Sequence, residues 1–333
     1  MSAGADQGPW LVADIGGTNA RFGLVRGAGA PVEDIVGLKC ADFDSPQAAA
    51  RSYLDTIGAR RGTPPLPTVA AFAVASPIAG DTVKLTNNNW TIARSAVATA
   101  LGARSVLLLN DFEALSLALP RLAEHEFEPV GRPRPDRSLT MAVIGPGTGL
   151  GVATCLPGPN GQWRALPGEG GHATAAAADD FESDVLRLVR AEFGHVSAER
   201  VLSGIGLPTL YRAVTRVRGG QPLELAPDDI TARALAGTDE HCVATLDTFC
   251  AMLGGFAGNV ALTVGARGGV FICGGIVPRL GRWFMQSKFR ERFEDKGRFS
   301  PYLASIATAV VTAEHPALTG AAEAIELQPG AAA

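Results

Sequence analysis

The chain has 333 residues, of which 47% are hydrophobic and 19% are charged, and its formal net charge is -4 at pH 7. This length predicts two domains with ample apolar material for their cores, and the charge argues against a nucleic-acid partner. The five cysteines are scattered and odd in number, which argues against a disulfide framework and against a zinc site, and favours a reducing cytoplasmic setting.

Strand and helix patterns alternate along the first third of the chain, which predicts sheets covered by helices. Ser45 is expected to cap the first helix, with Pro46 at its first position. The expected strands are Trp10–Asp14, Arg21–Arg26, Ile35–Cys40, Val69–Val74 and Val106–Leu109, and the expected helices are Gln47–Ala59 and Ile92–Leu101.

The rest of the chain continues this alternation after a connector at 129–138, which is rich in Pro and Arg. Helices are expected over Asp180–Phe193 and from about Asp239 to Val264, followed by a strand from Gly269 that ends in Gly274–Gly275. The apolar stretches at Val69–Ala79 and Val270–Val277 are too short to span a membrane, so no membrane partner is expected.

Two similar segments are the most informative feature of the sequence. Leu11–Asn19 and Met141–Gly149 each run from an apolar strand into a glycine-rich turn that carries Thr, and the strand-like runs Ala20–Val25 and Leu150–Cys155 follow them. Such turns expose backbone N–H groups that bind anions. Either turn alone could be an ordinary hairpin, but two of them favour a polyphosphate site and a nucleotide-dependent phosphotransferase.

The first turn offers particular chemistry to a nucleotide. Gly16 and Gly17 allow close approach of the backbone, and Thr18 and Asn19 can donate hydrogen bonds to phosphate oxygens. Asp14 could hold hydrated Mg²⁺, which prefers oxygen ligands. The sequence lacks the P-loop and protein-kinase motifs, and its glycines do not fit the register of a dinucleotide site.

Asn110 and Asp111 follow a buried strand, Leu107–Leu109. The carboxyl ends of strands in open α/β sheets are where ligands bind. Asp111 could therefore accept the proton of a substrate hydroxyl as that hydroxyl attacks a phosphate. The alternative is that Asp111 merely caps the next helix.

Three further segments carry candidate ligands. Glu169 and His172 lie in the glycine-rich segment Pro167–His172 and suit recognition of sugar hydroxyls. Glu199 is another acceptor, although a Glu beside Arg on a helix is usually a surface ion pair. Gly274–Gly275 could lie against an adenine or ribose, or could form a simple turn into a helix at Val277–Leu280.

Taken together, these segments resemble the bacterial glucokinase family of the hexokinase, actin and heat-shock-ATPase superfamily. The resemblance runs nearly end to end, and no cysteine lies near His172, which sets aside the zinc-containing repressor/kinase group. It rests on 13–21, 75–81, 109–112, 145–151, 168–172, 195–204, 268–278 and 293–299.

The resemblance implies two actin-like (ribonuclease H-like) α/β lobes with a ligand cleft between them. The small lobe would comprise residues 1–122 and a C-terminal helix within 315–333, and the large lobe would comprise 123–314. The resemblance further implies a cytoplasmic homodimer in glycolysis that uses ATP and Mg²⁺ to phosphorylate D-glucose at its 6-hydroxyl.

The resemblance also assigns site residues. Asp111 would be the catalytic base, and Asn110, Asp111, Glu169, His172 and Glu199 would bind the sugar. The nucleotide would be bound by Ala13, Asp14, Ile15, Gly16, Gly17, Thr18, Asn19, Gly147, Thr148, Gly149, Gly274 and Gly275, with Asp14 holding the metal through water.

Three alternatives keep the same fold. The first is a kinase for mannose or fructose, and the second is a sugar or nucleotide sensor without turnover, which would have no use for a base at Asp111. The third is an acyl-phosphate kinase, which the acidic sugar site disfavours because its substrate is a carboxylate.

Overall fold

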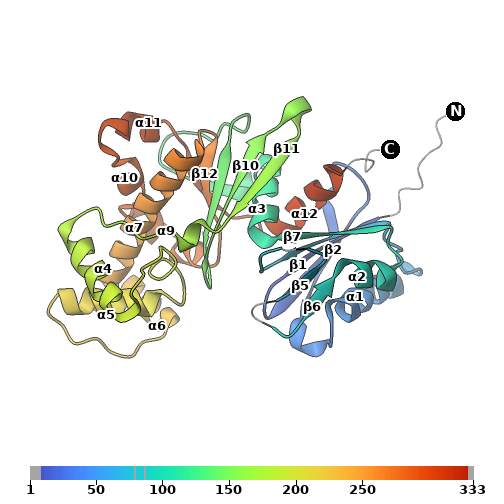
Figure 1. Ribbon diagram of the computed structural model, residues 1–333, viewed down its shortest axis with the longest axis horizontal. Coiled ribbons are helices and arrows are strands. Elements are labelled where there is room, and N and C mark those ends of the chain that lie inside the picture. The colour runs from blue at the N-terminus through green and yellow to red at the C-terminus, as the bar shows by residue number, and fades with distance from the viewer. Residues whose placement is uncertain (1–8, 79, 86–87, 329–333) are drawn as a thin grey trace. The chain divides into compact units, whose positions relative to one another are not determined.

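The computed structural model describes residues 9–78, 80–85 and 88–328, and the chain divides into two compact units. Unit 1 comprises Met1–Leu122, Gly158–Ala165 and Glu314–Ala333, and unit 2 comprises Ala123–Pro157 and Leu166–Ala313. Each unit contains a β-sheet with helices packed on it (Figure 1). The predicted α/β class is therefore confirmed.

The sheet of unit 1 has the strand order β3-β2-β1-β4-β7. Its first three strands are antiparallel, and β1, β4 and β7 run parallel. Every residue of β4 is buried, as expected for a parallel strand with both faces covered. The strands are β1 (Trp10–Ile15), β2 (Asn19–Val25), β3 (Val32–Lys39), β4 (Val69–Val74) and β7 (Ser105–Asn110), and β5 (Thr82–Lys84) and β6 (Thr91–Ala93) form a separate pair.

Helices cover both faces of this sheet. Phe72 of β4 belongs to the core formed with α1 and α2, whereas the next residue, Ala73, packs with Ala114 and Ala317 of α3 and α12. Ser45 caps α1 as predicted, because its hydroxyl accepts a hydrogen bond from the backbone N–H of the third helical residue. The helices are α1 (Pro46–Arg61), α2 (Arg94–Leu101), α3 (Asp111–Ala118) and α12 (Pro316–Glu326).

The sheet of unit 2 has the order β11-β10-β9-β12-β13-β8. β9 and β10 form an antiparallel hairpin, and β9, β12 and β13 run parallel, as β1, β4 and β7 do in unit 1. The two units therefore share this arrangement of an antiparallel hairpin followed by two parallel strands. The strands are β8 (Phe127–Val130), β9 (Met141–Pro146), β10 (Leu150–Pro157), β11 (Trp163–Gly168), β12 (Gly269–Ile272) and β13 (Thr308–Val311).

The long helix α7 is the core helix of unit 2. It is long and apolar enough to pass as a membrane span by composition, but 61% of its most apolar window is buried within the fold. Burial by its neighbours therefore accounts for its apolar character. The helices of unit 2 are α4 (Asp180–Phe193), α5 (Leu207–Val217), α6 (Pro227–Ala236), α7 (Glu240–Val264), α8 (Val277–Leu280), α9 (Arg282–Gln286), α10 (Phe289–Glu294) and α11 (Ser300–Ala304).

Two sequence predictions need correction. The helix expected at Ile92–Leu101 begins only at Arg94, because Ile92 is buried in β6 and pairs with Val83. The connector expected at 129–138 begins later, because Pro129 and Val130 belong to β8. β8 lies at the edge of its sheet, where a proline is tolerated. Of the C-terminal helix expected within 315–333, residues 329–333 lie outside the described residues.

Candidate active site

The first glycine-rich turn joins β1 to β2 in unit 1. The backbone N–H of Gly16 donates to the carbonyl of Asn19 at 3.0 Å, which closes the turn. Ala13 and Ile15 are fully buried, whereas Thr18 and Asn19 are exposed. Thr18 and Asn19 can therefore offer side chains to a ligand, and Ala13 and Ile15 can offer only backbone groups.

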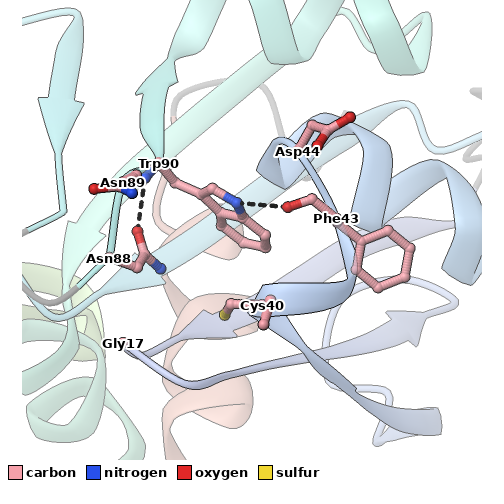
Figure 2. A pocket seen from close by; sticks show the side chains of 8 residues that line it. Gly17, Cys40, Phe43, Asp44, Asn88, Asn89 and Trp90 are labelled. Carbon is pink, nitrogen blue, oxygen red and sulfur yellow. Dashed lines mark hydrogen bonds between the residues drawn. The ribbon is translucent and has the colours of Figure 1, made fainter.

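A cavity of about 680 Å³ lies beside this turn (Figure 2). The Asn88 side-chain amide and the Cys40 thiol both donate to the Gly16 carbonyl, at 3.5 and 3.6 Å. The Trp90 indole donates to the Phe43 carbonyl at 3.0 Å, which fixes the cavity wall. These side chains thus support the turn. The lining residues are Gly17, Cys40, Ala41, Phe43, Asp44, Asn88, Asn89 and Trp90.

Asn110 and Asp111 stand where β7 passes into α3. The Asn110 side-chain oxygen accepts hydrogen bonds from the backbone N–H groups of Phe112 and Glu113, and the Glu113 carboxylate accepts from the Asn110 N–H at 3.3 Å. This capping box makes Asn110 the cap and Asp111 the first helical residue. The alternative that Asp111 is the helix cap is therefore wrong.

The surroundings of the Asp111 carboxyl disfavour its ionised form. Its pKa is raised to about 6, mainly by burial and in addition by the Asp14 carboxylate, against the lowering effect of the hydrogen bond from the Phe112 backbone N–H. Burial also raises the pKa of Asp14, against the lowering effects of Arg21, 3.5 Å away, and of His315. Asp14 and Asp111 are thus two carboxylates within electrostatic range that both resist ionisation.

This pair of carboxylates suits a hard divalent cation, because a cation relieves their repulsion and prefers oxygen ligands. Asp14 has a side chain that is 26% exposed, which leaves room for a bridging water. Within the described ranges, no group of three or more His, Cys, Asp and Glu side chains forms a ready-made metal site. Carboxylate oxygens are donors that suit Mg²⁺ better than a soft transition metal.

The second glycine-rich turn joins β9 to β10 in unit 2. The backbone N–H of Gly147 donates to the Gly149 carbonyl at 2.9 Å, and Thr148 is exposed. A Cβ added at Gly147 would meet no atom within 4 Å, so this face of the turn is open to a ligand. Like the first turn, this turn joins two antiparallel strands and exposes a threonine, but it is one residue shorter, because Pro146 pairs with Leu150 whereas Ile15 pairs with Ala20.

Gly274 and Gly275 lie beside this second turn. Gly274 has φ +88°, and a Cβ there would come within 2.5 Å of the Pro146 carbonyl oxygen, so only glycine fits. Gly275 faces open space. The helix α8 does begin at Val277, so this segment is both a turn into a helix and an open surface beside the glycine-rich turn.

The segment that carries Glu169 and His172 packs directly on β10. A Cβ on Gly171 would clash with the Leu150 carbonyl, so this glycine is what permits the close approach. The backbone N–H of His172 donates to the Glu169 carbonyl at 3.0 Å. The Glu169 and His172 side chains are exposed, as a ligand-binding role requires.

Glu199 lies in a turn rather than on a helix. Its Oε2 accepts a hydrogen bond from the Leu150 backbone N–H at 2.8 Å, and its Oε1 lies 4.0 Å from His172 Nδ1. The neighbouring Arg200 stacks on the Phe193 ring instead, with 4.3 Å to the ring centroid. The surface ion pair considered for Glu199 is therefore wrong.

The structure thus gathers the predicted residues into two sets. Unit 1 holds 13–19 with Asn110 and Asp111, and unit 2 holds 147–149 and 274–275 with Glu169, His172 and Glu199. Sequence reasoning missed the residues around Asp14. The contact of Arg21 with Asp14 could have been predicted from the sequence, because a hairpin that turns at Gly16–Gly17 places these two residues opposite each other. No sequence pattern pointed to the effect of His315 on Asp14, since the two residues are far apart in the sequence.

Comparison with known proteins agrees with this geometry. The family model described as glucokinase matches residues 11–328. The chain belongs to the glucokinase family. It is 50% identical to a glucokinase of Chromobacterium violaceum over 97% of this chain and 91% of the relative. It is also 46% identical to a glucokinase of Neisseria meningitidis, over 96% of this chain and 95% of the relative.

Solved glucokinase structures share the fold. A glucokinase from an Antarctic psychrotroph is 38% identical and superposes with a TM-score of 0.88 over 96% of this chain and 99% of its own. A glucokinase from Balamuthia mandrillaris, solved in complex with glucose, is 20% identical with a TM-score of 0.75 over 96% and 94% of the two chains, and shows the fold alone. The two-lobed actin-like fold implied by the sequence resemblance is confirmed.

Proposed function

We propose that this member of the glucokinase family transfers the γ-phosphoryl group of ATP to the 6-hydroxyl of D-glucose, with Asp111 as the general base. The products are glucose 6-phosphate and ADP. Family membership supports the reaction, and the observation that carries the proposed base is the partly buried Asp111 carboxyl, with its pKa of about 6, at the start of α3.

A carboxyl with this pKa suits its task. At neutral pH it is ionised, yet it is more basic than an ordinary Asp, and a base works best when its pKa lies near the working pH. Asn110 is proposed to assist through its Nδ2 donor, because its Oδ1 is committed to the cap of α3. Within the described residues, its Nδ2 donates one long hydrogen bond, to the Ser76 carbonyl at 3.4 Å.

The nucleotide is proposed to bind the two glycine-rich turns and Gly274–Gly275. Their backbone N–H groups, with the exposed Thr18 and Thr148 hydroxyls, would stabilise charge on the phosphates. Asp14 would hold Mg²⁺ through water. Magnesium supplies neutralisation of the phosphate charge when it is bound, and phosphoryl transfer depends mainly on such positioning and charge stabilisation.

The sugar is proposed to be a free, neutral hexose. Glu169, His172 and Glu199 would bind hydroxyls other than the reacting one. The carboxylates of Glu169 and Glu199 would repel sugar phosphates and sugar acids. A bound sugar that lacks a matched hydroxyl would cover one of these polar groups without pairing it, which is a costly mismatch.

The proposal extends to the setting of the enzyme. The five cysteines are buried and scattered, which supports a reducing cytoplasm. We also propose that the protein is a homodimer without nucleic-acid or membrane partners. The net charge of -4 is in line with the absence of a nucleic-acid partner.

The test is steady-state turnover of D-glucose with Mg-ATP, coupled to glucose 6-phosphate dehydrogenase, in wild type and Asp111→Asn. Loss of the base is expected to lower kcat by about 10²–10⁴-fold. Wild-type kcat should rise as pH increases through about 6 and then level off.

Folded wild-type protein that binds glucose without turnover would contradict the proposed reaction and favour a sensor. Faster turnover of mannose or fructose than of glucose would move the proposal to another hexose. Strong turnover of gluconate would contradict the acidic sugar site.

A further inference from the structure

The second glycine-rich turn is held in place by a segment that is distant from it in sequence. Gly204 N–H donates to the Gly147 carbonyl at 2.7 Å, and Ile205 N–H donates to the Thr148 carbonyl at 3.5 Å. The Glu199 carboxylate adds the third contact, at the end of the turn, by accepting from Leu150 N–H. We call residues 199–205 the brace.

The brace makes the turn sensitive to a side chain at one position. A Cβ at Gly149 would clash with Glu199 Oε2, whereas a Cβ at Gly147 would meet nothing within 4 Å. Gly149 does not have a positive φ. A side chain at position 149 would therefore displace the Glu199 carboxylate rather than strain the backbone.

The same carboxylate faces the loop of the proposed sugar ligands. Its second oxygen, Oε1, lies 4.0 Å from His172 Nδ1. The Glu199 backbone N–H also donates to the Gly171 carbonyl at 2.9 Å, which ties the brace to the same loop. The Glu199 side chain is 24% exposed, and its Oε2 is occupied by the Leu150 backbone N–H, which leaves Oε1 as the oxygen for a ligand.

We propose that Glu199 couples sugar binding to nucleotide binding within unit 2. One carboxylate oxygen accepts a hydrogen bond from the glycine-rich turn, and the other accepts one from a sugar hydroxyl. This inference rests on the proposed function and makes Glu199 a positioning residue for the phosphate turn as well as a sugar ligand.

The coupling follows from the geometry of a rigid carboxylate. A hydroxyl bound at Oε1 restricts rotation of the carboxylate and so keeps Oε2 on Leu150 N–H. The turn is then held in the arrangement that presents its N–H groups to phosphate. Coupling between two sites is reciprocal, so a bound nucleotide must tighten sugar binding by the same factor.

The test is titration calorimetry of D-glucose binding, alone and with a saturating non-hydrolysable ATP analogue and Mg²⁺. In wild type the analogue should tighten glucose binding by roughly 5-fold or more, within the usual range for coupled sites. In Glu199→Gln the ratio of the two dissociation constants should fall to about one, because the amide cannot accept hydrogen bonds from both partners.

Two further variants separate coupling from simple loss of a ligand. Glu169→Gln should weaken glucose binding and keep the wild-type ratio, because Glu169 makes no hydrogen bond to the turn within the described residues. Gly149→Ala should also abolish the ratio, although it leaves Glu169, His172 and the Glu199 carboxylate chemically unchanged, because its Cβ displaces Glu199 Oε2 from Leu150 N–H. Thermal unfolding of each variant first establishes that it is folded.

The inference is overturned if Glu199→Gln weakens glucose binding by the same factor with and without the analogue, since Glu199 would then be a sugar ligand only. It is also overturned if wild type phosphorylates glucose but shows a ratio of one. Wild type that binds no glucose at all would overturn the proposed function itself, so the two failures are distinguishable.

Discussion

At the scale of single residues, two neighbours at the end of β7 divide two tasks. Asn110 caps α3 by accepting from the backbone N–H groups of Phe112 and Glu113, and Asp111 shares only the Phe112 N–H through Oδ1, which leaves its Oδ2 for chemistry. The same burial that makes Asp111 a stronger base also disfavours its charged form. Asp111 is therefore expected to cost stability as well as to provide the proposed base.

Asp111→Asn should make the protein more stable above pH 6. The folded pKa is raised to about 6 from 3.8, so the penalty is absent below pH 3.8, where both states are protonated, and fully present above pH 6. The expected gain at pH 8 is about 1–3 kcal/mol, the free-energy equivalent of this pKa difference. Thermal unfolding at pH 8 and pH 4.5 measures it.

The gain should shrink at pH 4.5, because wild-type Asp111 is then mostly protonated. Asp55→Asn, at an exposed position on α1, is the control and should change little at either pH. If Asp111→Asn were no more stable than wild type at pH 8, the ionised Asp111 carboxylate would not cost stability.

At the scale of elements, α7 shows how packing decides the effect of one residue type. Gly254 and Gly255 are neighbours inside this helix, yet a Cβ at Gly254 would clash with the Phe289 carbonyl oxygen, and a Cβ at Gly255 would meet nothing within 4 Å. The first glycine lets α10 approach α7, whereas the second has no such role.

Replacing each glycine by alanine should therefore have opposite effects. Gly255→Ala should stabilise the protein by up to about 1 kcal/mol, because alanine is the better helix former. Gly254→Ala should destabilise it by roughly 1–3 kcal/mol, because overpacking outweighs that preference. Denaturant unfolding measures both, and a stabilising Gly254→Ala would show that α10 is not held against that position.

At the scale of the whole molecule, the two ends of the chain build one unit. We propose that unit 1 is the expected small lobe, with Gly158–Ala165 in addition to 1–122 and the C-terminal helix, and that unit 2 is the large lobe. Gly320 of α12 packs so closely on α3 that a Cβ would clash with the Ala114 carbonyl. The Glu323 carboxylate pairs with Arg121 at 2.6 Å, and Leu318 is fully buried.

Removal of residues 314–333 should therefore unfold unit 1 selectively, because one face of its sheet loses its cover. Differential scanning calorimetry should show the loss of one transition and the retention of that of unit 2. Leu318→Ala is the milder companion variant and should cost about 2–5 kcal/mol. A truncated chain with an unchanged calorimetric profile would contradict this dependence.

The sequence by itself determined the local features. The hairpins at both glycine-rich turns, the cap at Ser45 and the helix Asp180–Phe193 follow from strand patterns, glycine and capping chemistry that depend only on near neighbours. The resemblance to the glucokinase family also rests on such short segments, so the sequence alone is enough to indicate the family.

Only the tertiary structure decided which residues support the site. Asn88 and Cys40 on the first turn, and Glu199 on the second, are far in sequence from the turns they hold. The pKa of Asp111 depends on burial and on Asp14, which lies on a different strand. These properties arise from contacts between distant segments, so no local pattern could have predicted them.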